Sequence, residues 1–137
     1  MNERILITGG AGFIGMHLAR HLAKVGYTIV LVDNYARGIM DSELQALISL
    51  PGISFREVDL MEKKSVLSLG TDYLGIFHLA AIVGVKHVVQ SPYKVLVHNT
   101  KMLDNIIELA RKQTLLSGLF FSSTSEVYAG ASHHIDM

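Results

Sequence analysis

The sequence predicts an α/β domain in which a parallel sheet is wound with helices on both faces. Three observations lead to this fold class. Short apolar runs alternate with segments of helical spacing along the 137 residues. The apolar runs are hydrophobic on both sides, as strands covered by helices on each face must be. A glycine-rich turn joins the first apolar run to the first helical segment. This combination is typical of doubly wound sheets.

Five strands are predicted from short runs rich in Ile, Val, Leu and Phe. Each run is bounded by turn residues or by a segment of helical spacing. The predicted strands are Arg4–Thr8, Thr28–Val32, Ile53–Val58, Gly75–Leu79 and Gly118–Ser123.

Four helices are predicted between these strands. The second begins with Ser42 and Gln45 in the pattern of a capping box, and it ends before Pro51. The last has Pro92 just inside its start, after a Ser91 cap. The predicted helices cover Phe13–Val25, Ser42–Leu50, Met61–Leu69 and Pro92 to about Lys112.

The long helix that begins at Pro92 carries two apolar stripes, although one stripe is enough to cover a sheet. The surplus would meet a partner subunit or fill a deep groove on the sheet. One stripe contains Val95, Met102, Ile106 and Leu109, and the other contains Leu96, Leu103, Ile107 and Ala110.

Composition predicts one domain over residues 1–137, because half of the residues are hydrophobic and this length suits a single core. Twelve basic and twelve acidic residues cancel, which argues against partners such as nucleic acid or an anionic membrane. No apolar run approaches the length of a membrane span. With no cysteine and only scattered histidines, we predict no metal site. The first residues do not resemble a signal peptide, so we expect a cytoplasmic protein.

The turn after the first strand predicts a site for the phosphates of a dinucleotide. Gly10, Gly12 and Gly15 match G-x-G-x-x-G, whereas Gly9, Gly12 and Gly15 match G-x-x-G-x-x-G. The order of strand, turn and helix makes the motif more specific. Glycines let the backbone approach a phosphate closely, and N–H groups at the helix N-terminus bind it.

The other candidate residues follow the carboxyl ends of the strands, where a doubly wound sheet binds its ligand. Asp33 ends the second strand, about where an acidic residue meets the adenosine ribose. Asp59 follows the third strand and would either meet the adenine amino group or cap the next helix. Ala80 and Ala81 are small enough to let a cofactor lie against the backbone. The polar residues after the fifth strand are Ser122, Ser123, Thr124, Ser125 and Glu126.

Together these residues resemble the extended short-chain dehydrogenase/reductase family, the NAD-dependent epimerases and dehydratases of nucleotide sugars. The matching segments occur in the family's order, from Arg4 to about Gly130. The resemblance implies a Rossmann-type fold and NAD as the cofactor. The segments are Thr8–Gly15, Asp33-Asn34, Asp59-Leu60, His78–Ala81, Gly84-Val85, Pro92, Asn99 and Ser122–Tyr128.

The resemblance also implies a set of cofactor-binding residues. The glycines would carry the pyrophosphate, Asp33 would bind the ribose hydroxyls, and Asp59 with Leu60 would flank the adenine. Asn99 would help to hold the site. The full implied set is Gly9, Gly12, Phe13, Ile14, Gly15, Asp33, Asn34, Asp59, Leu60, Leu79, Ala80, Ala81, Asn99 and Ser122.

Thr124 and Glu126 are the catalytic residues that the resemblance implies. Thr124 matches the hydroxyl residue that hydrogen-bonds the sugar oxygen being oxidised. The family's base is a tyrosine followed four residues later by a lysine, and no such pair occurs in this chain. We therefore expect the N-terminal part of a longer enzyme, which binds cofactor but does not turn over substrate by itself.

The predicted function is that of an NAD-dependent nucleotide-sugar epimerase, dehydratase or decarboxylase that oxidises its sugar transiently. One alternative is a non-catalytic NAD(H)-binding module, because the Tyr-x-x-x-Lys pair is missing. The other is an NADP-dependent carbonyl reductase, which Thr124-Ser125-Glu126 disfavours because it resembles sugar-nucleotide enzymes.

The residue after the catalytic threonine predicts the reaction type. Dehydratases that act across C4 and C6 resemble one another in having Asp-Glu directly after the threonine. Here Ser125 stands in place of the aspartate, and serine is a poorer proton donor. We therefore expect a UDP-linked sugar with epimerisation or decarboxylation. The helix from Pro92 and the segment 83–89 also resemble the helices through which family members pair, so a homodimer is expected at full length.

Overall fold

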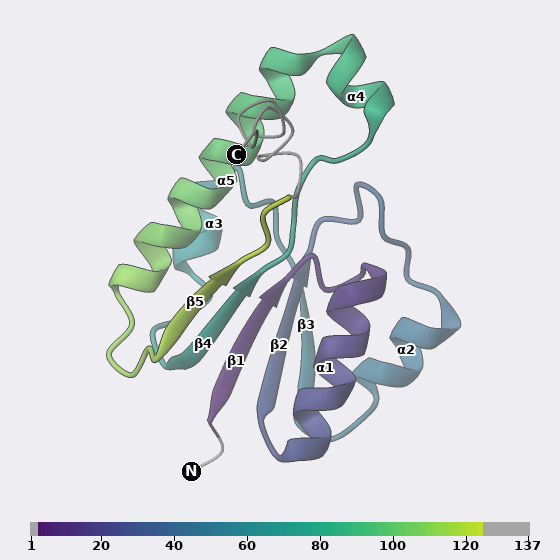
Figure 1. Cartoon of the computed structure of the whole chain (residues 1–137). Helices are drawn as coiled ribbons and strands as arrows, with labels where there is room; N and C mark the ends of the chain where they lie inside the picture. The colour runs from purple at the N-terminus through teal and green to yellow at the C-terminus, as the bar shows by residue number, and fades with distance from the viewer. Residues whose placement is uncertain (1–2, 125–137) are drawn as a thin grey trace, which may run out of the picture.

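The computed structural model describes residues 3–124, and its five parallel strands form one sheet. The strand order is β3-β2-β1-β4-β5 (Figure 1). The chain moves outward from β1 to β3 and then crosses to β4 on the other side of β1. The ends of β1 and β4 therefore form the switch point at which such sheets bind ligands. The strands are β1 (Arg4–Thr8), β2 (Thr28–Asp33), β3 (Ile53–Glu57), β4 (Tyr73–His78) and β5 (Gly118–Phe121).

Helices cover both faces of the sheet, which confirms the predicted Rossmann-type α/β fold. Figure 1 shows α1 and α2 on one face and α3 and α5 on the other. The short α4 lies beyond the carboxyl ends of the strands and leads into α5. The helices are α1 (Phe13–Val25), α2 (Ser42–Ile48), α3 (Lys63–Leu67), α4 (Val85–Gln90) and α5 (Pro92–Arg111). Within residues 3–124, no helix has both the length and the apolar character that a membrane span needs.

Two apolar layers form the core because side chains along a strand point alternately to opposite faces. On β1, Ile5 and Ile7 pack in the layer with α1 and α2, whereas Leu6 packs in the layer with α3 and α5. β2 divides its side chains in the same way. Burying each of these aliphatic side chains stabilises the fold by about 1.5–3 kcal/mol.

The start of β4 is fastened to the end of α5 by one side chain. Gln113 accepts a hydrogen bond from the backbone N–H of Tyr73 at 3.0 Å. Its Nε2 donates to the carbonyls of Gly70 at 3.0 Å and Leu109 at 2.9 Å. This contact lies at the amino-terminal edge of the sheet, away from the carboxyl ends of the strands.

The helices differ from the prediction in their bounds and in their number, and α2 ends at Ile48, before the predicted Leu50. α2 has Asp41 as its N-cap instead of Ser42, because the Asp41 carboxylate accepts the N–H of Leu44 at 2.9 Å. The third helix is shorter than predicted and begins at Lys63, since the residues before it form a tight turn. α4 was not predicted, because its VKHVVQ sequence is rich in β-branched valine.

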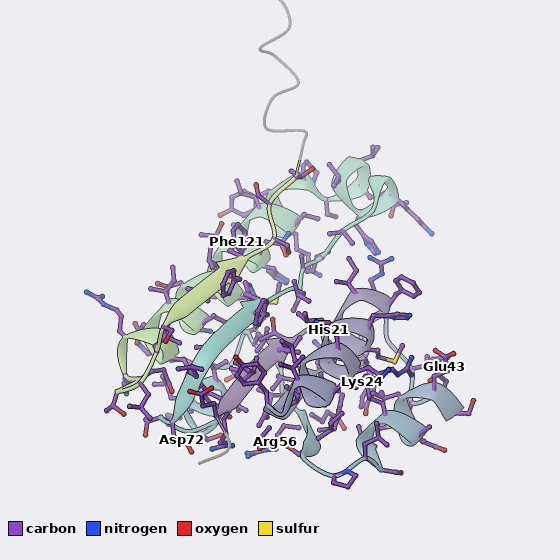
Figure 2. The ribbon with its side chains drawn as sticks, turned by 60° about the horizontal axis from the view of Figure 1, so that its bottom comes forward. His21, Lys24, Glu43, Arg56, Asp72 and Phe121 are labelled. Carbon is purple, nitrogen blue, oxygen red and sulfur yellow. The ribbon has the colours of Figure 1, made fainter. Side chains whose placement is uncertain are left out.

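The strands also differ slightly from the prediction at their ends. β4 starts at Tyr73, two residues before the predicted start, because the buried Tyr73 side chain anchors it by donating to the Leu69 carbonyl at 2.6 Å. β5 ends at Phe121, before the predicted Ser123. Figure 2 shows Phe121 on β5, well apart from His21 and Lys24 of α1.

An apolar cleft of about 210 Å³ lies on the sheet between α1 and β5. Phe77 of β4 and Phe120 of β5 stack there, with ring centroids 4.6 Å apart. Phe120 nevertheless remains 56% exposed. The α1 side of β5 is therefore only partly covered.

Candidate functional site

A cavity of about 980 Å³ opens at the carboxyl edge of the sheet, which is large enough for a cofactor. The loops after β1, β2, β3 and β4 line it, together with α4 and the start of α5. Most residues of the predicted site meet there: Gly9, Gly12, Phe13, Ile14, Gly15, Asp33, Asn34, Asp59, Leu79, Ala80, Ala81 and Ser122.

Three glycines of the turn are packed so tightly that a side chain would not fit. Gly9 has a φ of 72°, and a Cβ there would lie 2.9 Å from the backbone nitrogen of Ala80. A Cβ on Gly15 would lie 2.4 Å from the Gly9 carbonyl oxygen. At Gly10 a Cβ would lie 2.8 Å from the Cβ of Leu31. Gly10 therefore serves the contact with β2, whereas Gly9 and Gly15 bring the turn against β4 and α1.

The first turn of α1 presents backbone N–H groups to this cavity. Gly12 is the N-cap and has no side chain with which to satisfy them. The first intrahelical hydrogen bond runs from Met16 N to the Gly12 carbonyl at 3.0 Å. The N–H groups of Phe13, Ile14 and Gly15 precede it, at the positive end of the helix dipole. This arrangement favours a phosphate.

Asp33 holds two backbone segments while its carboxylate faces the cavity. One carboxylate oxygen accepts the N–H of Ala11 at 3.0 Å, and the other accepts the N–H of Tyr35 at 3.0 Å. Asp33 remains half-buried, and each oxygen has capacity for a further hydrogen bond. The carboxylate is therefore oriented in advance to accept hydroxyl groups, such as those of a ribose.

A buried pair links the ends of β1 and β4. The Thr8 hydroxyl lies 2.7 Å from Nδ1 of His78. It also accepts the N–H groups of Leu79 and Ala80, each at 3.2 Å. Burial lowers the pKa of His78 to about 4. The pair holds the segment after β4 beside Gly9.

Two predicted site residues support the cavity without lining it. Asn99 on α5 accepts the N–H of Ile82 at 2.8 Å and donates to its carbonyl at 3.0 Å. This double contact fixes the segment after β4 against α5. Leu60 is buried in the core, with 4% of its surface exposed.

Asp59 shapes the turn before α3. Its side chain accepts the N–H of Met61 at 2.9 Å, so the carboxylate closes an Asx turn. The N-cap of α3 is Glu62, so the predicted capping role of Asp59 is wrong, and its role at the adenine stays a prediction. Asp59 remains exposed and lines the cavity.

The residues predicted to be catalytic lie at and beyond the end of the described chain. Thr124 is exposed and is not part of the cavity wall. Ser122 lines the cavity, and its hydroxyl donates to the His78 carbonyl at 3.4 Å. Glu126 lies outside the described residues, as do Ser125 and Tyr128.

The sequence did not predict the cavity-lining residues that come from α4, from the start of α5 and from the loop 36–39. His87, Gln90, Ser91, Lys94 and His98 come from α4 and the start of α5. The sequence feature that could have located these residues is helix α4, which lies beyond the carboxyl ends of the strands. The loop 36–39 was also missed, although it directly follows Asp33 and Asn34. Within residues 3–124, no three potential ligands gather as a metal site would require.

Comparisons with known proteins identify the family of the chain. Residues 5–136 match the model of the NAD dependent epimerase/dehydratase family. The chain is 38% identical to the UDP-N-acetyl-alpha-D-glucosaminuronate decarboxylase of Bacillus cytotoxicus, over 93% of this chain and 38% of that protein. It therefore spans about two fifths of the length of this curated relative.

Two solved structures share the fold. The UDP-Glc/GlcNAc 4-epimerase of Campylobacter jejuni is 32% identical, with a TM-score of 0.83 over 93% of this chain and 39% of that one. The UDP-glucose 4-epimerase of Thermus thermophilus, in complex with NAD, is 32% identical with a TM-score of 0.67. That match covers 79% of this chain and 33% of the other. On the family match, the chain belongs to the NAD dependent epimerase/dehydratase family.

Proposed function

We propose that this chain is the NAD-binding part of an enzyme that transforms a nucleotide sugar through transient oxidation. The observation that carries the proposal is one cavity that joins the glycine turn, the first turn of α1 and the Asp33 carboxylate. Membership of an NAD-dependent family supports the same cofactor.

The residues present fit a dinucleotide in charge and in shape. The N–H groups of Phe13 and Ile14 would bind the pyrophosphate, since the tight glycine turn leaves the backbone bare there. Asp33 would accept the ribose hydroxyls, and Asp59 would lie at the adenine. Ala80, at the end of β4, would lie along the other half of the molecule. When bound, NAD supplies the hydride acceptor.

The proposed substrate is a UDP-linked sugar, and the proposed reaction is epimerisation or decarboxylation. The named activities of the decarboxylase and the two epimerases support this choice. Thr124 would hydrogen-bond the sugar oxygen that is oxidised, and Glu126 would belong to the same catalytic segment. Ser125 stands where C4–C6 dehydratases resemble one another in having aspartate, so that dehydration is disfavoured.

The chain's own residues cannot complete this reaction. It contains no tyrosine followed four residues later by lysine. The proposal therefore places the base in a longer protein, and this part alone would bind NAD without turnover. A non-catalytic NAD(H)-binding module remains the second candidate, because the same missing pair favours it.

A homodimer in the cytoplasm is proposed for the longer protein. The second apolar stripe of α5 is partly exposed, with Leu96 66% and Ile107 40% exposed and Leu103 and Ala110 half-buried. Tyr93, in the first turn of the helix, is 79% exposed. In the first stripe, Met102, Ile106 and Leu109 are buried in the core. A second copy would cover the exposed stripe.

The test uses the full-length protein with NAD⁺ and a panel of UDP- and dTDP-linked sugars. Products are identified by mass and by NMR. We expect an epimerised or decarboxylated product from a UDP-sugar. Loss of water from dTDP-glucose without activity on any UDP-sugar would overturn the reaction assignment. NAD binding with no turnover of any sugar would favour the module.

A further inference from the structure

A buried amide on α5 holds the turn before α3 from behind. Asn105 is fully buried, and its Nδ2 donates to the carbonyls of Leu60 at 2.8 Å and Met61 at 3.2 Å. These two carbonyls lie more than forty positions earlier in the chain. Asn105 therefore ties α5 to the loop that follows β3.

Packing alone does not explain an asparagine at this position. Its Oδ1 is buried and has no hydrogen-bond partner among the described residues. An unpaired buried oxygen is costly, and most buried polar atoms in proteins are paired. The surrounding layer is apolar and includes Val66, Ile106 and Leu109. A leucine of similar size would avoid this cost, so the two donated hydrogen bonds must account for the amide.

Those two hydrogen bonds act on a loop that lines the cavity. Asp59 and Met61 are both part of the cavity wall, whereas Asn105 is not. The Asp59 carboxylate closes the loop on itself through the Met61 N–H at 2.9 Å. Asn105 then fixes the same loop to α5 through the carbonyls of Leu60 and Met61. The loop is held from two sides, which sets where the Asp59 side chain can lie.

We propose that Asn105 is a positioning residue for the adenosine half of the bound dinucleotide. This inference rests on the proposed NAD-binding function, in which Asp59 lies at the adenine. Asn105 acts through the backbone of Leu60 and Met61 and never touches the ligand. Replacing Asn105 leaves both carbonyls without their hydrogen-bond donor, so the loop shifts. The adenosine half of the dinucleotide then loses its contact with the loop at Asp59.

The chain offers a matched control just beyond the C-terminal end of the same helix. Gln113 also fastens α5 to a distant segment, through Tyr73 N and the Gly70 carbonyl. That contact lies at the amino-terminal edge of the sheet, away from the cavity. Gln113→Leu therefore removes a comparable set of hydrogen bonds without touching the loop at Asp59.

The experiment titrates this chain with NAD⁺, AMP and nicotinamide mononucleotide by calorimetry. Wild type, Asn105→Leu and Gln113→Leu are compared. For Asn105→Leu we expect the Kd for AMP to rise about tenfold, the factor that corresponds to losing one hydrogen bond between Asp59 on the shifted loop and the adenine. The Kd for nicotinamide mononucleotide should stay within about twofold. For Gln113→Leu both values should stay within about twofold, because a purely structural loss does not discriminate between the halves of NAD.

The outcomes separate this inference from the proposed function. If wild type binds neither NAD⁺ nor AMP, the proposed function fails. If wild type binds both and Asn105→Leu leaves AMP binding unchanged, or weakens both mononucleotides equally, only the role of Asn105 is wrong.

A measurement on wild type keeps the inference testable if Asn105→Leu does not fold. The side-chain amide signals of Asn105 and Gln113 are followed by ¹H–¹⁵N NMR during the same titrations. We expect AMP to shift the Asn105 signals and leave those of Gln113 in place. Nicotinamide mononucleotide should shift neither pair. Asn105 signals that do not move at saturating AMP would overturn the inference.

Discussion

The Thr8 hydroxyl lies 2.7 Å from Nδ1 of His78, and the other hydrogen bonds of the hydroxyl set the direction of this one. Its two lone pairs already accept the N–H groups of Leu79 and Ala80, so its own proton has one place to go. Nδ1 is therefore unprotonated, and the neutral ring carries its proton on Nε2. Protonating His78 would place two donors against each other at the junction of β1 and β4.

This pair predicts a specific loss of stability in acid. The pKa of His78 is lowered from 6.5 to about 4 by burial. The unfolded chain therefore binds more protons between these values, and stability falls as the pH falls through this window. The difference corresponds to about 3 kcal/mol between pH 7 and pH 4. Denaturant unfolding measured across this range would check the slope.

His78→Asn is the control, because its side-chain oxygen can still accept the Thr8 proton but does not titrate. Between pH 7 and pH 4, the free energy of unfolding of the variant should fall by about 3 kcal/mol less than that of wild type. The contributions of the other titrating groups remain. An identical pH dependence in variant and wild type would show that His78 does not carry the effect.

Gly12→Val should abolish NAD binding without unfolding the chain. Gly12 has an extended φ of −85°, and a Cβ there would approach one atom, the Gly9 carbonyl oxygen, at 3.2 Å. The branched side chain would instead occupy the approach of the pyrophosphate, so the Kd should rise about a hundredfold or more. Calorimetry gives the Kd, and circular dichroism checks the fold.

Gly26→Ala is the control variant, which should lower stability without changing NAD affinity. Gly26 has a φ of 108° at the end of α1, far from the glycine turn, so alanine there should cost about 1 kcal/mol of stability. NAD affinity should not change. Unaltered NAD affinity in a folded Gly12→Val variant would show that the phosphate site lies elsewhere.

Asp33 should make the chain prefer NAD over NADP by at least about tenfold. The carboxylate would repel a 2′-phosphate and accept both ribose hydroxyls. Arg37 is a neighbouring cation, but its guanidinium donates to the Val83 carbonyl at 3.4 Å. Asp33→Asn removes the charge and should narrow the preference, whereas Asp104→Asn removes an exposed charge on α5 and should not. Tighter binding of NADP to wild type would refute the prediction.

The exposed stripe of α5 predicts that the full-length protein is a dimer at micromolar concentration. Leu96→Glu would place a charge in the apolar stripe that a second copy covers in the dimer. The variant should therefore be monomeric. Leu115→Glu replaces an equally exposed leucine in the loop after α5 and should leave the dimer intact. Light scattering distinguishes these states. A full-length wild type that is a stable monomer at this concentration would show that the predicted interface is wrong.

The fold was predictable because its signals are local. Arg4–Thr8 and Phe13–Val25 have the predicted bounds, since a buried strand and an amphipathic helix each show a clear period. The strand ends then located Asp33, Ala80 and Ser122 at the cavity, because parallel strands place their carboxyl ends at one edge.

The rest was hidden because it depends on contacts between distant segments. Asn105 reaches carbonyls at Leu60 and Met61, and Gln113 reaches Tyr73 across forty positions. No local pattern announces such hydrogen bonds. The cap at Asp41 was missed because Ser42 stood beside it and is an equally good cap by type.

The two backbone anchors of Asp33 have a consequence for redesign of the cofactor preference. The side chain that would choose between the dinucleotides also ties Ala11 in the glycine turn to Tyr35 after β2. Replacing Asp33 by a small neutral residue would make room for a 2′-phosphate. The same replacement removes the two hydrogen bonds that hold these segments. A successful switch therefore needs a replacement acceptor for these two N–H groups, supplied by a second substitution in the loop 34–40.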